Sequence, residues 1–104
     1  MMSGPNGQPP GAYQISISGM VAAEVADVGK RATQEGWFAA YEAALLEIDR
    51  RLRSDPMGFG ELVEDLAALK LIVHVRLVPP LVVRFAIHQE MRVVFLMEVS
   101  SFSP

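Results

Sequence analysis

From Leu71 to Val99 the hydrophobicity of the side chains follows a period of two residues. Every odd-numbered position is apolar or a proline, apart from Gln89. Because successive side chains of a strand point to opposite faces, this alternation predicts a sheet with one buried face and one polar face. The polar groups of the segment fall at even-numbered positions, as His74, Arg76, Arg84, His88, Arg92 and Glu98.

Three strands account for this segment, at about Leu71–Val78, Leu81–His88 and Arg92–Val99. Pro79 and Pro80 have no amide hydrogen to donate to a ladder, so they must form the first connection. Cross-strand neighbours lie on the same face of a sheet. Pairing even positions with even positions therefore requires an odd number of residues in each connection.

Two registers satisfy this condition at the first connection. A loop at 79–81 sets Arg76 opposite Arg84, and a loop at 78–80 sets His74 opposite Arg84. A loop at 89–91 sets His88 opposite Arg92 at the second connection. In each case the five basic side chains share one surface of the sheet.

The N-terminal half predicts a short strand followed by a helix. Residues 12–18 alternate apolar and polar side chains, which is typical of a half-buried strand. Ser18 can cap the following helix, because its side-chain oxygen can accept a hydrogen bond from a free amide. Gly36 is a typical helix C-terminus. The helix has one apolar stripe, formed by Val21, Val25, Val28 and Ala32.

A second helix is predicted from about Trp37 to Arg53, and Asp55-Pro56 ends it. Glu47 with Arg51, and Asp49 with Arg53, have the spacing of stabilising i,i+4 pairs. The apolar stripe is Phe38, Tyr41, Leu45, Ile48 and Leu52. The two stripes predict a helical hairpin laid across the odd face of the sheet, over a core that contains Phe85 and Phe95.

Met57–Lys70 is predicted to be a loop with a short helical turn at Leu62, Leu66 and Leu69. The expected fold is therefore α+β, in the order β-α-α-β-β-β. A helical hairpin packs on one face of a small, mainly antiparallel, twisted sheet. A chain of 104 residues has room for one domain, at 12–104. Residues 1–11 contain three prolines and three glycines and are predicted to form a flexible tail.

Composition excludes several classes of protein. The chain has no cysteine, which excludes disulfides and thiolate metal sites and fits the cytoplasm. No apolar run approaches the roughly 18 residues of a membrane span, so no membrane association is expected. The net charge is −3, with most acidic residues in the first half and a mildly basic second half. That balance is far from the strongly basic signature of an autonomous nucleic-acid binder.

The order strand, helix, helix, loop and three strands resembles the RelE/ParE toxin superfamily, over about Tyr13 to Phe102. The segments that carry the resemblance are Leu52-Arg53-Ser54-Asp55-Pro56, the loop Phe59–Leu69, Val82-Val83-Arg84-Phe85-Ala86-Ile87-His88 and Arg92-Val93-Val94-Phe95-Leu96. Members of this family are small cytoplasmic bacterial toxins of type II toxin–antitoxin pairs. The RelE branch cleaves mRNA on the ribosome, and the ParE branch poisons DNA gyrase.

The resemblance implies a toxin that binds an antitoxin protein, with ribosome and mRNA, or gyrase, as its target. Family members usually carry an arginine where Val82 stands, and often a basic residue where this chain has Ser100, Ser101 and Phe102. The resemblance therefore implies a ribosome-dependent mRNA endoribonuclease with degenerate catalytic residues.

Metal-independent RNA cleavage needs a proton acceptor, a proton donor and cations at the charged phosphorane. His74 and His88 are the candidate acid and base, because imidazole titrates near neutral pH. Arg76 and Arg84 complete the candidate catalytic set as guanidinium forks for phosphate. Two histidines with Glu98 as the one nearby carboxylate make a poor metal set, so neither a metal nor a cofactor is expected. The candidate residues for binding RNA, phosphate or a partner are Lys70, Arg76, Arg84 and Arg92.

Three alternatives to catalysis remain open. The basic residues can be the ordinary solvated side of the sheet. The chain can instead be a non-catalytic interaction domain, because apolar side chains mix with the arginines at the even positions Val78, Val82, Val94 and Leu96. A partner segment with acidic groups suits such a mixture. A homodimer formed through the same face is the third alternative.

Overall fold

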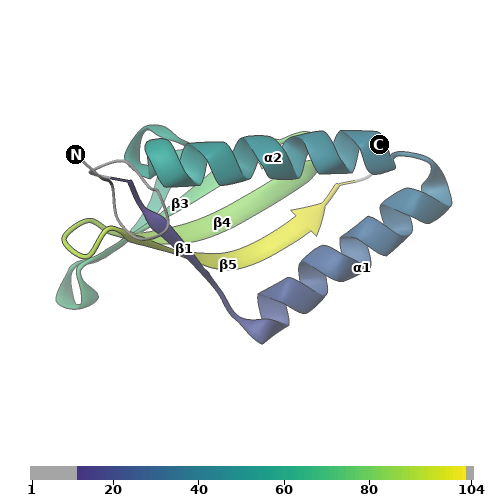
Figure 1. Cartoon of the computed structure of the whole chain (residues 1–104). Coiled ribbons are helices and arrows are strands. Elements are labelled where there is room, and N and C mark those ends of the chain that lie inside the picture. The colour runs from purple at the N-terminus through teal and green to yellow at the C-terminus, as the bar shows by residue number, and fades with distance from the viewer. Residues whose placement is uncertain (1–11, 103–104) are drawn as a thin grey trace, which may run out of the picture.

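The computed structural model describes residues 12–102, which form two helices packed on one face of a five-stranded sheet. The strands are β1 (Gln14–Ile17), β2 (Glu61–Leu66), β3 (Leu71–Val78), β4 (Leu81–His88) and β5 (Val93–Ser101), and the helices are α1 (Gly19–Glu35) and α2 (Phe38–Ser54). Two short 3-10 turns, η1 (Pro56–Gly58) and η2 (Ala67–Leu69), flank β2. Figure 1 shows α2 along the top of the sheet and α1 at the lower right, beside β5, so the predicted α+β fold class is confirmed. The predicted tail, residues 1–11, lies outside the described residues.

The strands lie in the order β1-β5-β4-β3-β2. β1 runs parallel to β5, and the other neighbours are antiparallel. A parallel pair needs a long connection between its strands, and the helical hairpin with the three intervening strands supplies it. Neither α1 nor α2, the two α-helices within residues 12–102, is long and apolar enough to cross a membrane.

Helix α1 begins and ends where the sequence predicts. The Ser18 hydroxyl accepts a hydrogen bond from the Val21 amide at 3.2 Å. Gly36 adopts a φ of 84°, the left-handed conformation that favours glycine at a helix end. The predicted stripe is confirmed: Val21, Val28 and Ala32 are buried against the sheet and α2.

The two helices approach closely at Gly29. The Tyr41 hydroxyl of α2 donates a hydrogen bond of 2.8 Å to the Val25 carbonyl of α1. A Cβ atom at Gly29 would lie 2.9 Å from the Tyr41 hydroxyl oxygen, closer than such atoms pack. Glycine therefore makes room for the tyrosine ring between the helices. Burial there raises the pKa of Tyr41 above its ordinary value.

The end of α2 differs in one pairing from the prediction. Asp49 and Arg53 form the expected ion pair at 3.1 Å. Glu47 instead pairs with Arg50 at 2.8 Å, which leaves Arg51 directed toward η1. Asp55 ends α2 as predicted, and its carboxylate accepts a hydrogen bond from the Gly58 amide at 3.2 Å. This turn folds the chain back beneath the helix.

The prediction of a loop over residues 57–70 is wrong for Glu61–Leu66, which form the edge strand β2. β2 pairs antiparallel to β3, with an irregularity between Leu62 and Glu64. Leu62 and Val63 are 63% and 52% exposed, so β2 lacks the buried alternation by which a strand is recognised. The predicted helical turn is confined to Ala67–Leu69.

The core lies between the helical hairpin and the central strands. Leu81, Val83, Phe85 and Ile87 of β4 are fully buried and face the apolar stripe of α2. Phe59 enters this core from the η1 turn, 1% exposed, and its ring stacks on that of Phe85 with the centroids 5.8 Å apart. Phe38, expected in the stripe, is 43% exposed and contacts the rim of the core through Tyr41.

Replacing Tyr41 by phenylalanine removes the hydrogen bond between the helices. We expect Tyr41→Phe to lower the free energy of unfolding by about 1 kcal/mol at neutral pH. Because the pKa of Tyr41 is raised in the folded state, the wild-type protein loses stability as pH rises above 10.0, the ordinary value. The variant lacks that contribution, so the difference between the two proteins should shrink at alkaline pH. Urea unfolding at pH 7 and above pH 10 measures this, and a difference that grows with pH would contradict it.

Candidate functional site

The register of the sheet decides which of the predicted site residues lie together. Val78 pairs with Leu81 across a two-residue turn, in which the Pro79–Pro80 peptide bond is cis. His88 pairs with Val93 across a four-residue connection. Both connections have an even number of residues, so the predicted odd-length loops are wrong. Each even-length turn brings even positions of one strand onto the same face as odd positions of the next.

The four predicted catalytic residues consequently divide between two faces. The face beneath α1 and α2, called the helix face from here on, contains His74, the register partner of the core residue Phe85. Arg76 is two residues further along β3 and lies on the same face. Arg84 and His88 lie on the opposite face, called the outer face. The expectation that all four share one surface is therefore wrong.

A β-bulge in β5 again changes which residue positions lie on which face of the sheet. Phe85 pairs with Leu96 but Arg84 pairs with Glu98, so Met97 is an additional residue. Phe95 lies on the outer face and is 38% exposed, contrary to its predicted place in the core. Of the apolar residues expected among the arginines, Val82 is on the outer face, whereas Val78, Val94 and Leu96 are on the helix face.

His74 is a buried side chain of the core. It is 5% exposed, and its Nδ1 atom makes a hydrogen bond of 3.1 Å with the Phe59 carbonyl. Its ring lies against Phe85, with the centroids 5.7 Å apart. The imidazole thus provides a polar partner for the carbonyl of a chain segment that enters the core.

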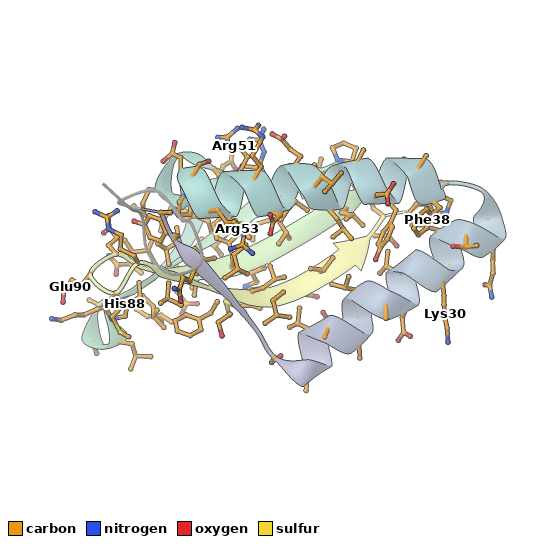
Figure 2. All side chains as sticks on the ribbon, viewed as in Figure 1. Lys30, Phe38, Arg51, Arg53, His88 and Glu90 are labelled. Atoms are coloured by element: carbon orange, nitrogen blue, oxygen red, sulfur yellow. The ribbon has the colours of Figure 1, made fainter. Side chains whose placement is uncertain are left out.

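His88 lies at the start of the β4–β5 connection, far from the α1–α2 turn (Figure 2). Its Nδ1 atom accepts a hydrogen bond of 3.2 Å from the Met91 amide and so closes the connection. Because His74 and His88 are on opposite faces of the sheet, they cannot act as acid and base on one phosphate. The histidine pair predicted for RNA cleavage is not assembled.

Lys70 and Arg92, two of the predicted binding residues, lie at turns. Lys70 has a φ of 57° between η2 and β3, and its ammonium group is 3.3 Å from the Glu90 carboxylate. Arg92 has a φ of 55°, and its guanidinium lies 5.4 Å from the centroid of the Tyr13 ring. Both side chains already interact within this end of the sheet.

Arg84 occupies the centre of the outer face. It is only partly exposed, and its register partners are Val75 and Glu98. Within residues 12–102 no carboxylate lies within 4.0 Å of its guanidinium, and its buried Nε atom has no hydrogen-bond partner. A partly desolvated cation without an acceptor costs free energy that a ligand can recover.

Exposed apolar side chains surround Arg84 on the outer face. Leu77 and Phe95 pair with Val82 and Ala86, the residues of β4 two positions before and after Arg84, and they are 51% and 38% exposed. Met97, the additional residue of the β5 bulge, is 42% exposed. Both α-helices of the described chain pack their buried side chains on the helix face. The outer face therefore combines accessible apolar area with a guanidinium that has no carboxylate within 4.0 Å among residues 12–102.

A second cationic site was not predicted. Arg51 of α2 and Arg76 of β3 both lie over the ring of Phe59, with guanidinium carbons 5.0 and 5.6 Å from the ring centroid. Sequence reasoning missed it because Arg51 was assigned to an ion pair with Glu47. Phe59 stands in a short non-periodic segment, and the one available signal was the Asp55-Pro56 turn that leads into it.

Within the described part of the chain, no three histidine or acidic side chains come together in a way that would hold a metal ion.

Comparison of the chain with protein-family models, with curated proteins and with solved structures gives no match.

The two histidines should differ in their contribution to stability. His74→Ala leaves a cavity and an unpaired carbonyl in the core, so we expect a loss of about 2–4 kcal/mol in the free energy of unfolding. His88→Ala removes one hydrogen bond at a turn and should cost about 1 kcal/mol. Urea unfolding of both variants measures the difference. Equal losses, or a larger loss for His88→Ala, would show that His74 is not a core residue.

Proposed function

We propose that this protein is the toxin-like component of a cytoplasmic type II toxin–antitoxin pair and that it acts by binding proteins through its outer face. The observation that carries the proposal is the Arg84 guanidinium, partly desolvated and without an acceptor within residues 12–102. A carboxylate from a partner would neutralise it and accept its hydrogen bonds.

The occupant proposed for the outer face is a segment of the antitoxin that carries apolar side chains and at least one aspartate or glutamate. Leu77, Phe95 and Met97 offer the apolar contact, and Arg84 offers the charge. Burial of such a pair at the centre of an interface makes it a strong determinant of affinity, because truncation leaves the other charge unpaired.

The toxin–antitoxin class is taken from the resemblance of the element order to the RelE/ParE superfamily. The strand, helical hairpin and strands follow one another in that order, with β2 added at the edge of the sheet. The site favours binding over RNA cleavage, since the buried His74 and the turn residue His88 do not meet. In this proposal a toxic effect arises from binding to the ribosome or to gyrase, the targets that the resemblance implies.

Binding to the antitoxin is tested with the protein encoded by the adjacent open reading frame. We expect the two to form a complex, and Arg84→Ala to weaken it by at least 10-fold, corresponding to about 1.4 kcal/mol or more. Lys30→Ala, which removes an equal charge from the exposed surface of α1 (Figure 2), should change the affinity by less than about twofold. Isothermal titration calorimetry measures both.

Three results would contradict the proposed interface. They are no complex with the neighbouring gene product, an Arg84→Ala complex as tight as the wild type, and a stable homodimer of the free chain closed over the outer face. Sedimentation of the free protein distinguishes the last of these.

Toxicity is tested by induced expression in a bacterial host. Expression of this chain alone should slow growth, and co-expression with the antitoxin should restore it. Total mRNA should stay intact, because the proposed effect is binding. Normal growth with soluble protein present would contradict the toxin assignment, and site-specific mRNA cleavage lost in His88→Ala would contradict a binding mechanism.

A further inference from the structure

The ring of Phe59 brings together two arginines that are distant in the sequence. Arg51 belongs to the last turn of α2, and Arg76 belongs to β3. Phe59 is 1% exposed because its ring stacks on Phe85 and the two guanidiniums lie over it. The face of an aromatic ring attracts a cation that lies over it. The ring therefore offsets part of the repulsion between two like charges.

Neighbouring arginines of α2 have acidic partners, but Arg51 has none. Arg50 pairs with Glu47 at 2.8 Å and Arg53 pairs with Asp49 at 3.1 Å. Within residues 12–102, no carboxylate lies within 4.0 Å of Arg51 or Arg76. The hydrogen bond that Arg51 does make is to the Gly58 carbonyl, at 3.3 Å.

Most of the donor capacity of the two guanidiniums is therefore available. Each guanidinium has five N–H donors in a planar fork. Arg76 is exposed and Arg51 is partly exposed, so a ligand can reach both from solvent. Figure 2 shows Arg51 projecting from α2 on the side away from α1, where the hairpin does not cover it.

We propose that Arg51 and Arg76 form a binding site for a single phosphate monoester group. The combined charge of the two guanidiniums matches a phosphate dianion, which carries about −1.5 to −2 at neutral pH, better than it matches a carboxylate. Guanidinium forks also suit the oxygens of phosphate.

The same geometry argues against a nucleic-acid strand as the ligand. The Phe59 ring is covered, so it offers no surface on which a base can stack. The chain has a net charge of −3, which disfavours a polyanion at long range. The site thus fits one terminal phosphate. The rest of the molecule that bears this phosphate is expected to contribute little to the binding affinity. This inference concerns the helix face and is independent of the outer-face interface proposed above.

The test uses the full chain with three probes at constant ionic strength: inorganic phosphate, adenosine 5′-monophosphate and acetate. Side-chain NMR of the arginine Nε–H groups and calorimetry measure binding. We expect phosphate and the nucleotide to bind with affinities within about threefold of each other, and acetate to bind at least tenfold more weakly. The affinity for the nucleotide should fall between pH 7.5 and pH 5, because the dianion of a phosphate monoester becomes a monoanion near pH 6.

Arg76→Gln is the decisive variant, because Arg76 is exposed and its loss should leave the fold intact. It should weaken phosphate binding at least tenfold, and Arg51→Gln should do the same. Arg50→Gln removes an equal charge from the same helix and serves as the matched control, with an expected change below about twofold. Thermal unfolding of each variant confirms that it is folded.

The proposal is overturned by any of four results. These are no saturable binding of phosphate to the wild-type protein, binding unchanged in Arg76→Gln, acetate binding as tightly as phosphate, and a nucleotide that binds far more tightly than phosphate. The third would indicate a carboxylate site, and the fourth would indicate recognition of the base or sugar.

Discussion

The two-residue connection at Pro79 and Pro80 determines which side chains of β3 and β4 share a face. With Val78 opposite Leu81, every later pair of these strands joins an even position to an odd one. His74 is thereby placed against Phe85 in the core, and Arg84 is placed on the outer face beside Val75. An odd number of residues in this turn would have reversed the orientation of all eight side chains of β4 relative to β3. The placement of Arg76 on the helix face and of Arg84 on the outer face follows from this one connection.

Local features of the fold were predictable because their causes are local. Ser18 and Gly36 delimit α1 through interactions within a few residues, and Asp55 ends α2 because proline follows it. The end of β3 and the start of β4 were predicted from Pro79 and Pro80. Helical stripes also depend only on the helix period, so Val28 and Ile48 were placed correctly in the core.

Pairing between segments was less predictable, for a physical reason. The length of a turn, and therefore the relative face of two strands, depends on backbone geometry that apolar patterning does not encode. Residues 71–77 illustrate this. Val73 and Leu77 lie on the same face of β3, but Val73 is buried and Leu77 is exposed. β2 is an edge strand in which Leu62 and Val63 are both exposed, so it has no alternating burial pattern to detect. Arg51 and Arg76 meet only because an aromatic side chain from an irregular segment lies between their elements.

The parallel pairing of β1 with β5 has a consequence for the biosynthesis of this protein. Gln14 is the register partner of Val93, so β1 gains its neighbour only after both helices and the three intervening strands have been synthesised. Until then, Ile15 and the apolar side of α1 have no sheet to cover. Closure of such a long loop is entropically costly and is expected late in folding. The nascent chain thus carries an incomplete hydrophobic surface until β5 has been synthesised.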